Sequence, residues 1–272
     1  MTWLWRVLLT TVIMASGSVM AQDLEFDNVS EGDLEKVVRD FSSNFHHTAV
    51  TGAKPLGSVF GFEVGLIGGL GKVNSLDDVI EDTDPDADVP GLIPHGGLLG
   101  IVSVPFGWTF ELTLIPEAGD DSFKFSNTTF GVKWSLTETL LSALPLSIAI
   151  RGHYSQTKID FEQEDPGVTS ATVDGTYEST VTGVQAVVSK DFLIVSPYAA
   201  VGILQANGDL GVKGSDTIFD TDFTASDSAS VDTSSTQFLA GAELKLAIIK
   251  FAAEYSRQFD TERYTFKFSA FF

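Results

Sequence analysis

The clearest pattern along the chain is the alternation of apolar and polar residues at its C-terminal end. Between residues 264 and 272 every second residue is apolar, namely Tyr264, Phe266, Phe268, Ala270 and Phe272. Thr265, Lys267 and Ser269 lie between them. Successive side chains of a strand point to opposite faces, so this segment predicts a strand with one aromatic face and one largely polar face. Residues 237–245 and 250–256 repeat the alternation. Such strands are typical of a membrane barrel, whose apolar residues face lipid and whose polar residues face the lumen.

Alternation and turn-forming residues divide residues 58–272 into ten strands. We place them at 58–69, 97–104, 108–116, 122–136, 146–161, 177–189, 197–207, 235–246, 249–258 and 262–272. The three longest connections, 70–96, 162–176 and 208–234, all fall at the same end of these strands. Bacterial outer-membrane barrels have an even strand number, short periplasmic turns and longer external loops. The predicted fold is therefore all-β: a transmembrane antiparallel β-barrel of about ten strands (about 8–12), preceded by a short amphipathic helix.

The first residues predict export. Arg6 precedes a short apolar core at 7–14, and the small residue Ala21 ends a plausible cleavage site. The apolar core is much shorter than the roughly 20 residues that a spanning helix needs. We therefore predict a signal peptide at 1–21, a periplasmic helix and linker at 22–57, and an outer-membrane barrel at 58–272.

An amphipathic helix is predicted at about residues 31–47, because apolar residues recur there every three or four positions: Leu34, Val37, Val38, Phe41 and Phe45. Two interpretations of its apolar stripe remain. The favoured one packs the helix against the periplasmic rim, where the apolar turns at 137–145 and 190–196 would contact it. The other makes it a hatch that enters the barrel and controls access.

Charge and composition exclude some functions. The formal net charge of −21 becomes −22 when Arg6 leaves with the signal peptide, so binding to nucleic acid through its phosphates is not expected. The absence of cysteine excludes disulfides and thiolate chemistry. A run of carboxylates, Asp82, Asp84, Asp86 and Asp88, is a weak candidate for divalent cations. Ala87 and Ile93 break the EF-hand pattern, which favours a solvated, self-repelling loop.

Charged residues on the polar faces of the strands are candidates for lining the lumen. They are Glu63, Glu111, Lys133, Arg151, His153, Glu243, Lys245, Glu254 and Lys267. Both signs of charge are present, and barrels of about eight strands have interiors largely filled by side chains. A ladder of ion pairs filling a narrow barrel is the favoured interpretation, and a small pore lined by these charges is the alternative.

Catalytic patterns are not found. The four histidines are His46, His47, His95 and His153; His95 is placed in a Gly-rich loop, and Asp160 is too far along the strand to reach His153 directly. No serine lies in a G-x-S-x-G setting. We therefore predict a protein that is not an enzyme and carries no cofactor. The leading hypothesis is a narrow channel or transporter for small or hydrophobic molecules. The alternative is a structural or adhesion barrel acting through its acidic external loops, and a hydrolase is least favoured.

Several segments together resemble a family of predicted outer-membrane barrels of unknown function. They are residues 33–36, 54–57 and 60–65, the strand containing Trp134, and Leu144, Pro145 and Leu146 leading into 148–152. The resemblance covers almost all of the mature chain and implies no functional residues. A helix before a barrel is also distantly similar in layout to the fatty-acid type of hydrophobic transporter. The aromatic end, with Tyr264, Phe266, Phe268 and Phe272, is similar to the signal that the barrel-assembly machinery recognises. The other expected partners are membrane lipid, lipopolysaccharide and divalent cations.

Overall fold

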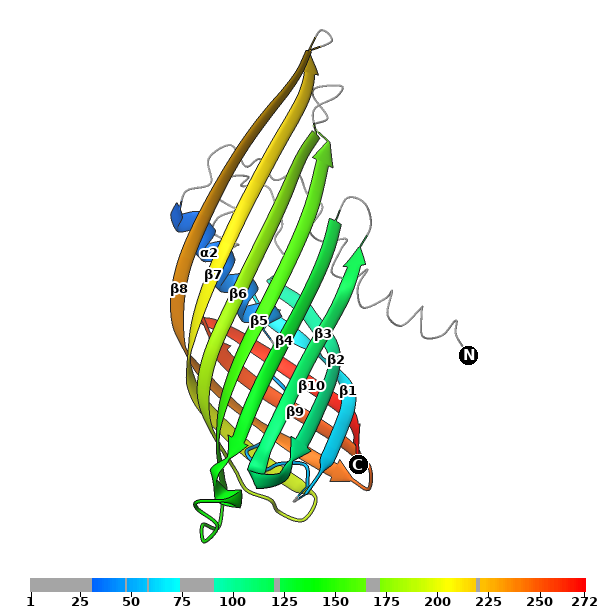
Figure 1. Ribbon diagram of the computed structural model, residues 1–272, viewed down its shortest axis with the longest axis vertical. Helices are drawn as coiled ribbons and strands as arrows, with labels where there is room; N and C mark the ends of the chain where they lie inside the picture. Colours follow the sequence, from blue (N-terminus) through cyan, green and yellow to red (C-terminus); the bar gives the residue numbers. More distant parts are fainter. Residues whose placement is uncertain are drawn as a thin grey trace, which may run out of the picture.

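The computed structural model describes residues 31–46, 48–57, 59–73, 91–119, 123–164, 172–218 and 221–272. In this part of the chain ten antiparallel strands form a closed barrel, and β1 pairs with β10 to complete it (Figure 1). The strands are β1 (Gly61–Lys72), β2 (Leu92–Val104), β3 (Trp108–Gly119), β4 (Phe123–Ser135), β5 (Ser147–Glu164), β6 (Thr172–Ser189), β7 (Val195–Ile218), β8 (Thr221–Leu246), β9 (Ile249–Gln258) and β10 (Thr261–Phe271). One helix, α2 (Glu31–Phe45), precedes them, and the short 3-10 turns η1 (Pro105–Gly107) and η2 (Leu136–Glu138) follow β2 and β4. The predicted fold class is confirmed.

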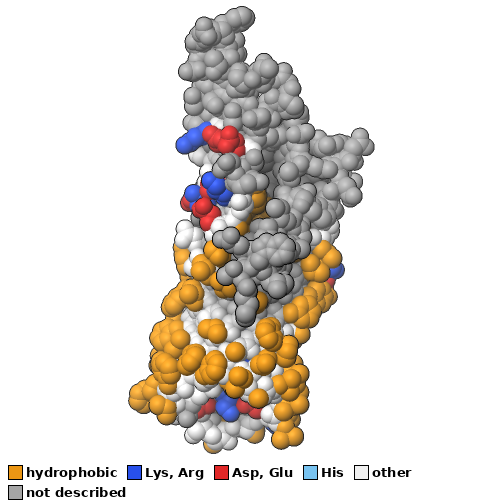
Figure 2. All heavy atoms as spheres, turned by 90° about the vertical axis from the view of Figure 1, so that its right-hand side faces the viewer, with side chains coloured by type: hydrophobic (Ala, Val, Ile, Leu, Met, Phe, Trp, Pro, Cys, Tyr) orange, Lys and Arg blue, Asp and Glu red, His pale blue; other side chains and the backbone are white. Residues whose placement is uncertain are grey.

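The alternation read from the sequence sets which side chains enter the barrel. In β10, Arg263 and Lys267 are buried, whereas Tyr264, Phe266 and Phe268 are exposed. Apolar side chains gather over the lower half of the face shown in Figure 2, where they form an outward belt. A closed barrel with such a belt meets the requirements of a membrane, because every described strand is paired on both sides and the belt offers a largely apolar surface to lipid. The aromatic end faces outward as well, and its recognition during assembly stays a prediction.

The strands differ greatly in length. β7 and β8 have 24 and 26 residues, whereas β9 and β10 have 10 and 11. The predicted loop at 208–234 is therefore wrong: the ladder between β7 and β8 continues without interruption to the pair Ile218↔Thr221. Beyond the belt a strand has no lipid to face, so its outward residues are polar and the apolar alternation that marks a spanning strand ends. His95, predicted in a Gly-rich loop, is a buried residue of β2.

Helix α2 lies inside the barrel and contacts β7 and β8 most extensively, so the favoured rim interpretation is wrong. The apolar side chains of the helix meet apolar side chains that β5, β6 and β7 turn into the lumen. Amphipathicity indicates that one face is buried, but it does not say against which surface. Among the described residues, no helix has the length and apolarity needed to cross a membrane.

After the helix the chain runs down the lumen to the start of β1. We call residues 31–56 the plug. Its lower part is bonded to inward side chains of many strands, including Ser189, Glu243, Arg151 and Lys133. The predicted signal peptide at 1–21 and the acidic run from Asp82 to Asp88 lie outside the described residues.

Candidate functional site

The first cluster of lumen charges joins the first strand of the barrel to its last three strands. The carboxylate of Glu63 in β1 lies 2.6 Å from Lys250 Nζ and 2.9 Å from Lys267 Nζ. Lys267 also contacts Glu243 Oε1 at 2.9 Å. All four side chains are almost completely buried. Each carboxylate is thus matched by ammonium groups, which is the condition under which buried charges are tolerated. Because β1 and β10 form the closing pair, this cluster links the strands on both sides of the closure.

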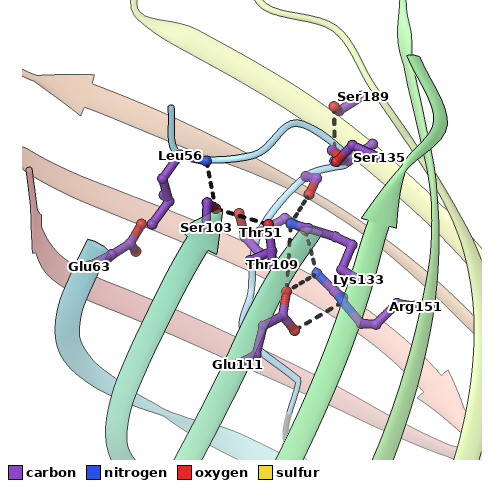
Figure 3. Close-up of polar contacts among 12 residues, drawn as sticks. Thr51, Leu56, Glu63, Ser103, Thr109, Glu111, Lys133, Ser135, Arg151 and Ser189 are labelled. Carbon is purple, nitrogen blue, oxygen red and sulfur yellow. Dashed lines mark hydrogen bonds and ion pairs between the residues drawn. The ribbon is translucent and has the colours of Figure 1, made fainter. Parts of the chain in front are cut away.

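The second cluster binds the plug itself (Figure 3). Arg151 Nε lies 3.1 Å from Glu111 Oε2, and Lys133 Nζ lies 3.5 Å from Glu111 Oε1. Arg151 Nη2 donates to the backbone oxygen of Thr51 at 3.1 Å, and Lys133 Nζ donates to that of Gly52 at 2.7 Å. These cations therefore hold the plug backbone against a carboxylate of the barrel wall.

Other plug backbone groups are bonded to side chains of further strands. The Gly52 N–H donates to Glu243 Oε2 at 3.3 Å, and the Ala53 N–H donates to Ser189 Oγ at 3.0 Å. The Leu56 N–H donates to Ser103 Oγ at 3.0 Å. An extended segment without a neighbouring strand needs such partners for its buried polar groups. The lumen is therefore filled by both an ion-pair ladder, as predicted, and the chain's own N-terminal segment.

Part of the outer lumen is apolar. Inward side chains of four elements form what we call the apolar patch: Ile159, Tyr177, Val181, Leu204, Ala206 and Phe259. Val38 of the helix is buried in it, and Phe41 packs edge-on against Tyr177 with ring centroids 5.3 Å apart. Gly208 of β7 leaves the space that Val38 occupies. A polar interior is usual for a membrane barrel, so this patch needs an apolar occupant, and the helix supplies one.

Two buried histidines meet between the ionic and apolar parts of the lumen. The rings of His46, from the plug, and His153, from β5, have centroids 4.5 Å apart. Arg263 Nη1 donates to the backbone oxygens of Ser43 and His46. Glu254 accepts a hydrogen bond from the Tyr198 hydroxyl at 2.8 Å. The plug is thus held to the wall at this level as well.

The C-terminal end of the plug is tied to the short turn between β6 and β7. Lys54 Nζ lies 3.1 Å from Asp191 Oδ2, and Lys245 Nζ lies 3.4 Å from Asp191 Oδ1. Partial burial would raise the pKa of Asp191, but the hydrogen bonds from Ser196 and Lys54 outweigh it and hold this pKa below its usual value. Lys245 thus lies at the rim and not deep in the lumen.

The structure places all nine sequence-predicted lumen residues on inward positions, and eight of them are buried. Sequence reasoning missed two further buried cations, Lys250 and Arg263. Both lie on the polar face of the alternation already recognised in β9 and β10. The alternation alone could therefore have predicted that they point into the lumen. The hydrogen bonds between the plug backbone and the wall could not be predicted from the sequence, because every residue has the same main-chain groups.

A family model described as a family of unknown function, DUF6588, matches residues 70–268, which is most of the chain. The chain belongs to this family. The match begins near the end of β1, so the plug precedes the matched residues. No curated protein matches the sequence.

Solved structures similar to this DUF6588 chain are outer-membrane barrels. Ail, the attachment invasion locus protein of Yersinia pestis, is 14% identical with a TM-score of 0.30, covering 78% of this chain and 97% of Ail. The translocator domain of the autotransporter NalP from Neisseria meningitidis is 9% identical with a TM-score of 0.38, covering 96% of this chain and 99% of that domain. Neisserial surface protein A is 9% identical with a TM-score of 0.29, covering 78% of this chain and 95% of that protein. The closed barrel and its apolar belt make the present chain an outer-membrane β-barrel.

Proposed function

We propose that the protein is a gated conduit for small hydrophobic molecules in the bacterial outer membrane, closed in this structure by its own plug. The observation that carries the proposal is the apolar patch, which faces the lumen where other barrels have polar residues. Removal of the helix would expose Val181, Leu204 and their neighbours to water. A hydrophobic ligand bound there would replace the contacts of Val38 and Phe41 and so lower the cost of opening.

The lower lumen supports a gate whose contacts can be exchanged. Thr51, Gly52 and Ala53 are bound there by hydrogen bonds, and water can satisfy the same donors and acceptors once the segment leaves. The ion pairs among Glu63, Lys250 and Lys267 lie within the wall and do not depend on the plug. The barrel can therefore keep its own charge pairs while the plug moves.

Uptake of radiolabelled naphthalene by whole cells tests this function. Cells carrying the protein are expected to take up naphthalene several-fold faster than cells without it, with no change in glucose uptake. The double variant Val181→Asn, Leu204→Asn should return naphthalene uptake to background, because amides in the patch disfavour an apolar ligand. The matched variant Val181→Ile, Leu204→Met keeps the patch apolar and should retain uptake. Equal uptake with and without the protein would contradict the proposal, provided that heat-dependent gel mobility confirms a folded barrel.

A second candidate is a non-transporting barrel that acts through its external part. The length of β7 and β8 favours this candidate, since crossing the membrane requires only about 9–11 residues of each strand. Roughly half of each strand therefore stands beyond the hydrocarbon. Asp209 and Asp232 are exposed there and give this part acidic character. Adhesion of cells carrying the protein to an immobilised cationic polymer, lost in the Asp209→Asn, Asp232→Asn variant, would support this candidate.

Neither function requires catalysis, and we also propose that the protein is not an enzyme. His153, the one histidine predicted on a strand, is buried against His46 and Gln185. The partners that fit the proposal are membrane lipid, lipopolysaccharide and the barrel-assembly machinery.

A further inference from the structure

The two ends of the plug lie at opposite ends of the barrel. Its C-terminal end contacts the periplasmic side: Leu56 is bonded to Ser103 at the end of β2, and Lys54 pairs with Asp191. Asp191 belongs to the short turn between β6 and β7. Short turns mark the periplasmic end of a bacterial outer-membrane barrel, and β1 starts from the same end.

The N-terminal part of the plug contacts the opposite end. Arg39 pairs with Asp260 in the turn between β9 and β10, which lies at the same end as the long β7–β8 hairpin. Glu35 accepts a hydrogen bond from Thr233 Oγ1 of β8 at 3.2 Å. Along the chain, the plug therefore runs from the external mouth of the barrel toward the periplasm.

The contact of Glu35 lies beyond the apolar belt. Phe238 of β8 and Ile203 of β7 are strongly exposed apolar residues on the outer face. From there outward, the outer face of β8 carries Thr236, Ser234 and Asp232, which are polar and exposed. Polar outward residues mark the part of the wall that faces water instead of lipid. Thr233 pairs with Ala206 in this outer part, so the helix begins outside the hydrocarbon layer.

We infer that the N-terminal end of α2 is presented at the extracellular surface, so that the plug passes through its own barrel from the external mouth to β1. This inference does not depend on the proposed transport function. It also fixes the orientation of the plug: its end near β1 is periplasmic, and the start of α2 is external.

Single cysteines test the topology cleanly because the chain has no cysteine of its own. Intact cells carrying Glu35→Cys are treated with a membrane-impermeant maleimide, since the Glu35 side chain is 44% exposed. Ser230→Cys on the outer part of β8 serves as the external control, and Leu193→Cys in the periplasmic turn serves as the internal control. Glu35→Cys is expected to be labelled in intact cells, as Ser230→Cys is. Labelling only after the outer membrane is permeabilised, as for Leu193→Cys, would overturn the inference.

A second measurement tests the external position of the plug if Glu35→Cys does not react with the maleimide. An epitope tag inserted between residues 23 and 24 is probed with antibody on intact and permeabilised cells. Antibody binding to intact cells supports display at the surface, whereas binding only to permeabilised cells contradicts it. Heat-dependent gel mobility confirms in both experiments that the barrel is folded.

Discussion

Deletion of residues 31–56 is expected to convert a closed barrel into a conducting pore. In planar bilayers the full mature protein should give no resolved current steps at neutral pH, and the deletion variant should give discrete steps. The physical reason is that this segment occupies the lumen, and Arg151, Lys133 and Glu243 would bind water and ions in its place. These side chains remain matched in charge by the wall, so the barrel should stay folded.

The matched control removes residues 23–30 and leaves the plug intact. This shorter deletion should remain closed, which separates loss of the plug from any effect of a shortened N-terminus. Equal conductance of the two deletion variants would contradict the gating role of residues 31–56. A folded barrel that stays silent without its plug would mean that wall side chains alone close the lumen, and the external part of the protein would then become the more important region.

Replacement of Glu243 by alanine should destabilise the protein strongly. Glu243 contacts Lys267 at 2.9 Å and Lys250 at 3.8 Å, and it also accepts bonds from Thr51 and Gly52. The variant leaves buried ammonium groups short of one counter-charge, and breaking such a pair costs roughly 3–5 kcal/mol. Urea unfolding of the protein in lipid vesicles, followed by tryptophan fluorescence, measures the loss.

Lys245→Ala is the control for this variant, because it lies two residues away in the same strand and on the same face. Lys245 is 30% exposed and pairs with Asp191 at the rim. A partly solvated ion pair of this kind contributes about 0–1 kcal/mol. Similar losses in Glu243→Ala and Lys245→Ala would contradict the importance of the buried cluster.

The sequence predicts the spanning strands well because the membrane imposes a simple rule on them. Lipid on one side and a polar lumen on the other force the alternation of β10, where Phe266 and Lys267 point to opposite faces. The rule stops where lipid stops. The outer parts of β7 and β8 face water, so their serines, threonines and aspartates have the composition of a solvated loop while forming a continuous ladder.

The position of the helix could not be predicted with the same rule. Val38 and Phe41 require an apolar partner, and both the periplasmic turns and the lumen wall offered one. A usable signal was present in β7, where residues 198–204 are apolar on both faces. Lipid contact explains Ile203, but it does not explain Leu204, which points inward. An inward apolar residue in a membrane strand indicates an apolar occupant of the lumen.

The closure between β1 and β10 also constrains the order of assembly. The strands that pair there stand at the beginning and the end of the barrel sequence, so the last lateral hydrogen bonds form only when the whole chain is available. Glu63, Lys250 and Lys267 then become enclosed together with Thr51 and Gly52. The plug precedes β1 in the chain, so it is available before this closure takes place. It can then serve as an internal template around which the curved sheet completes itself.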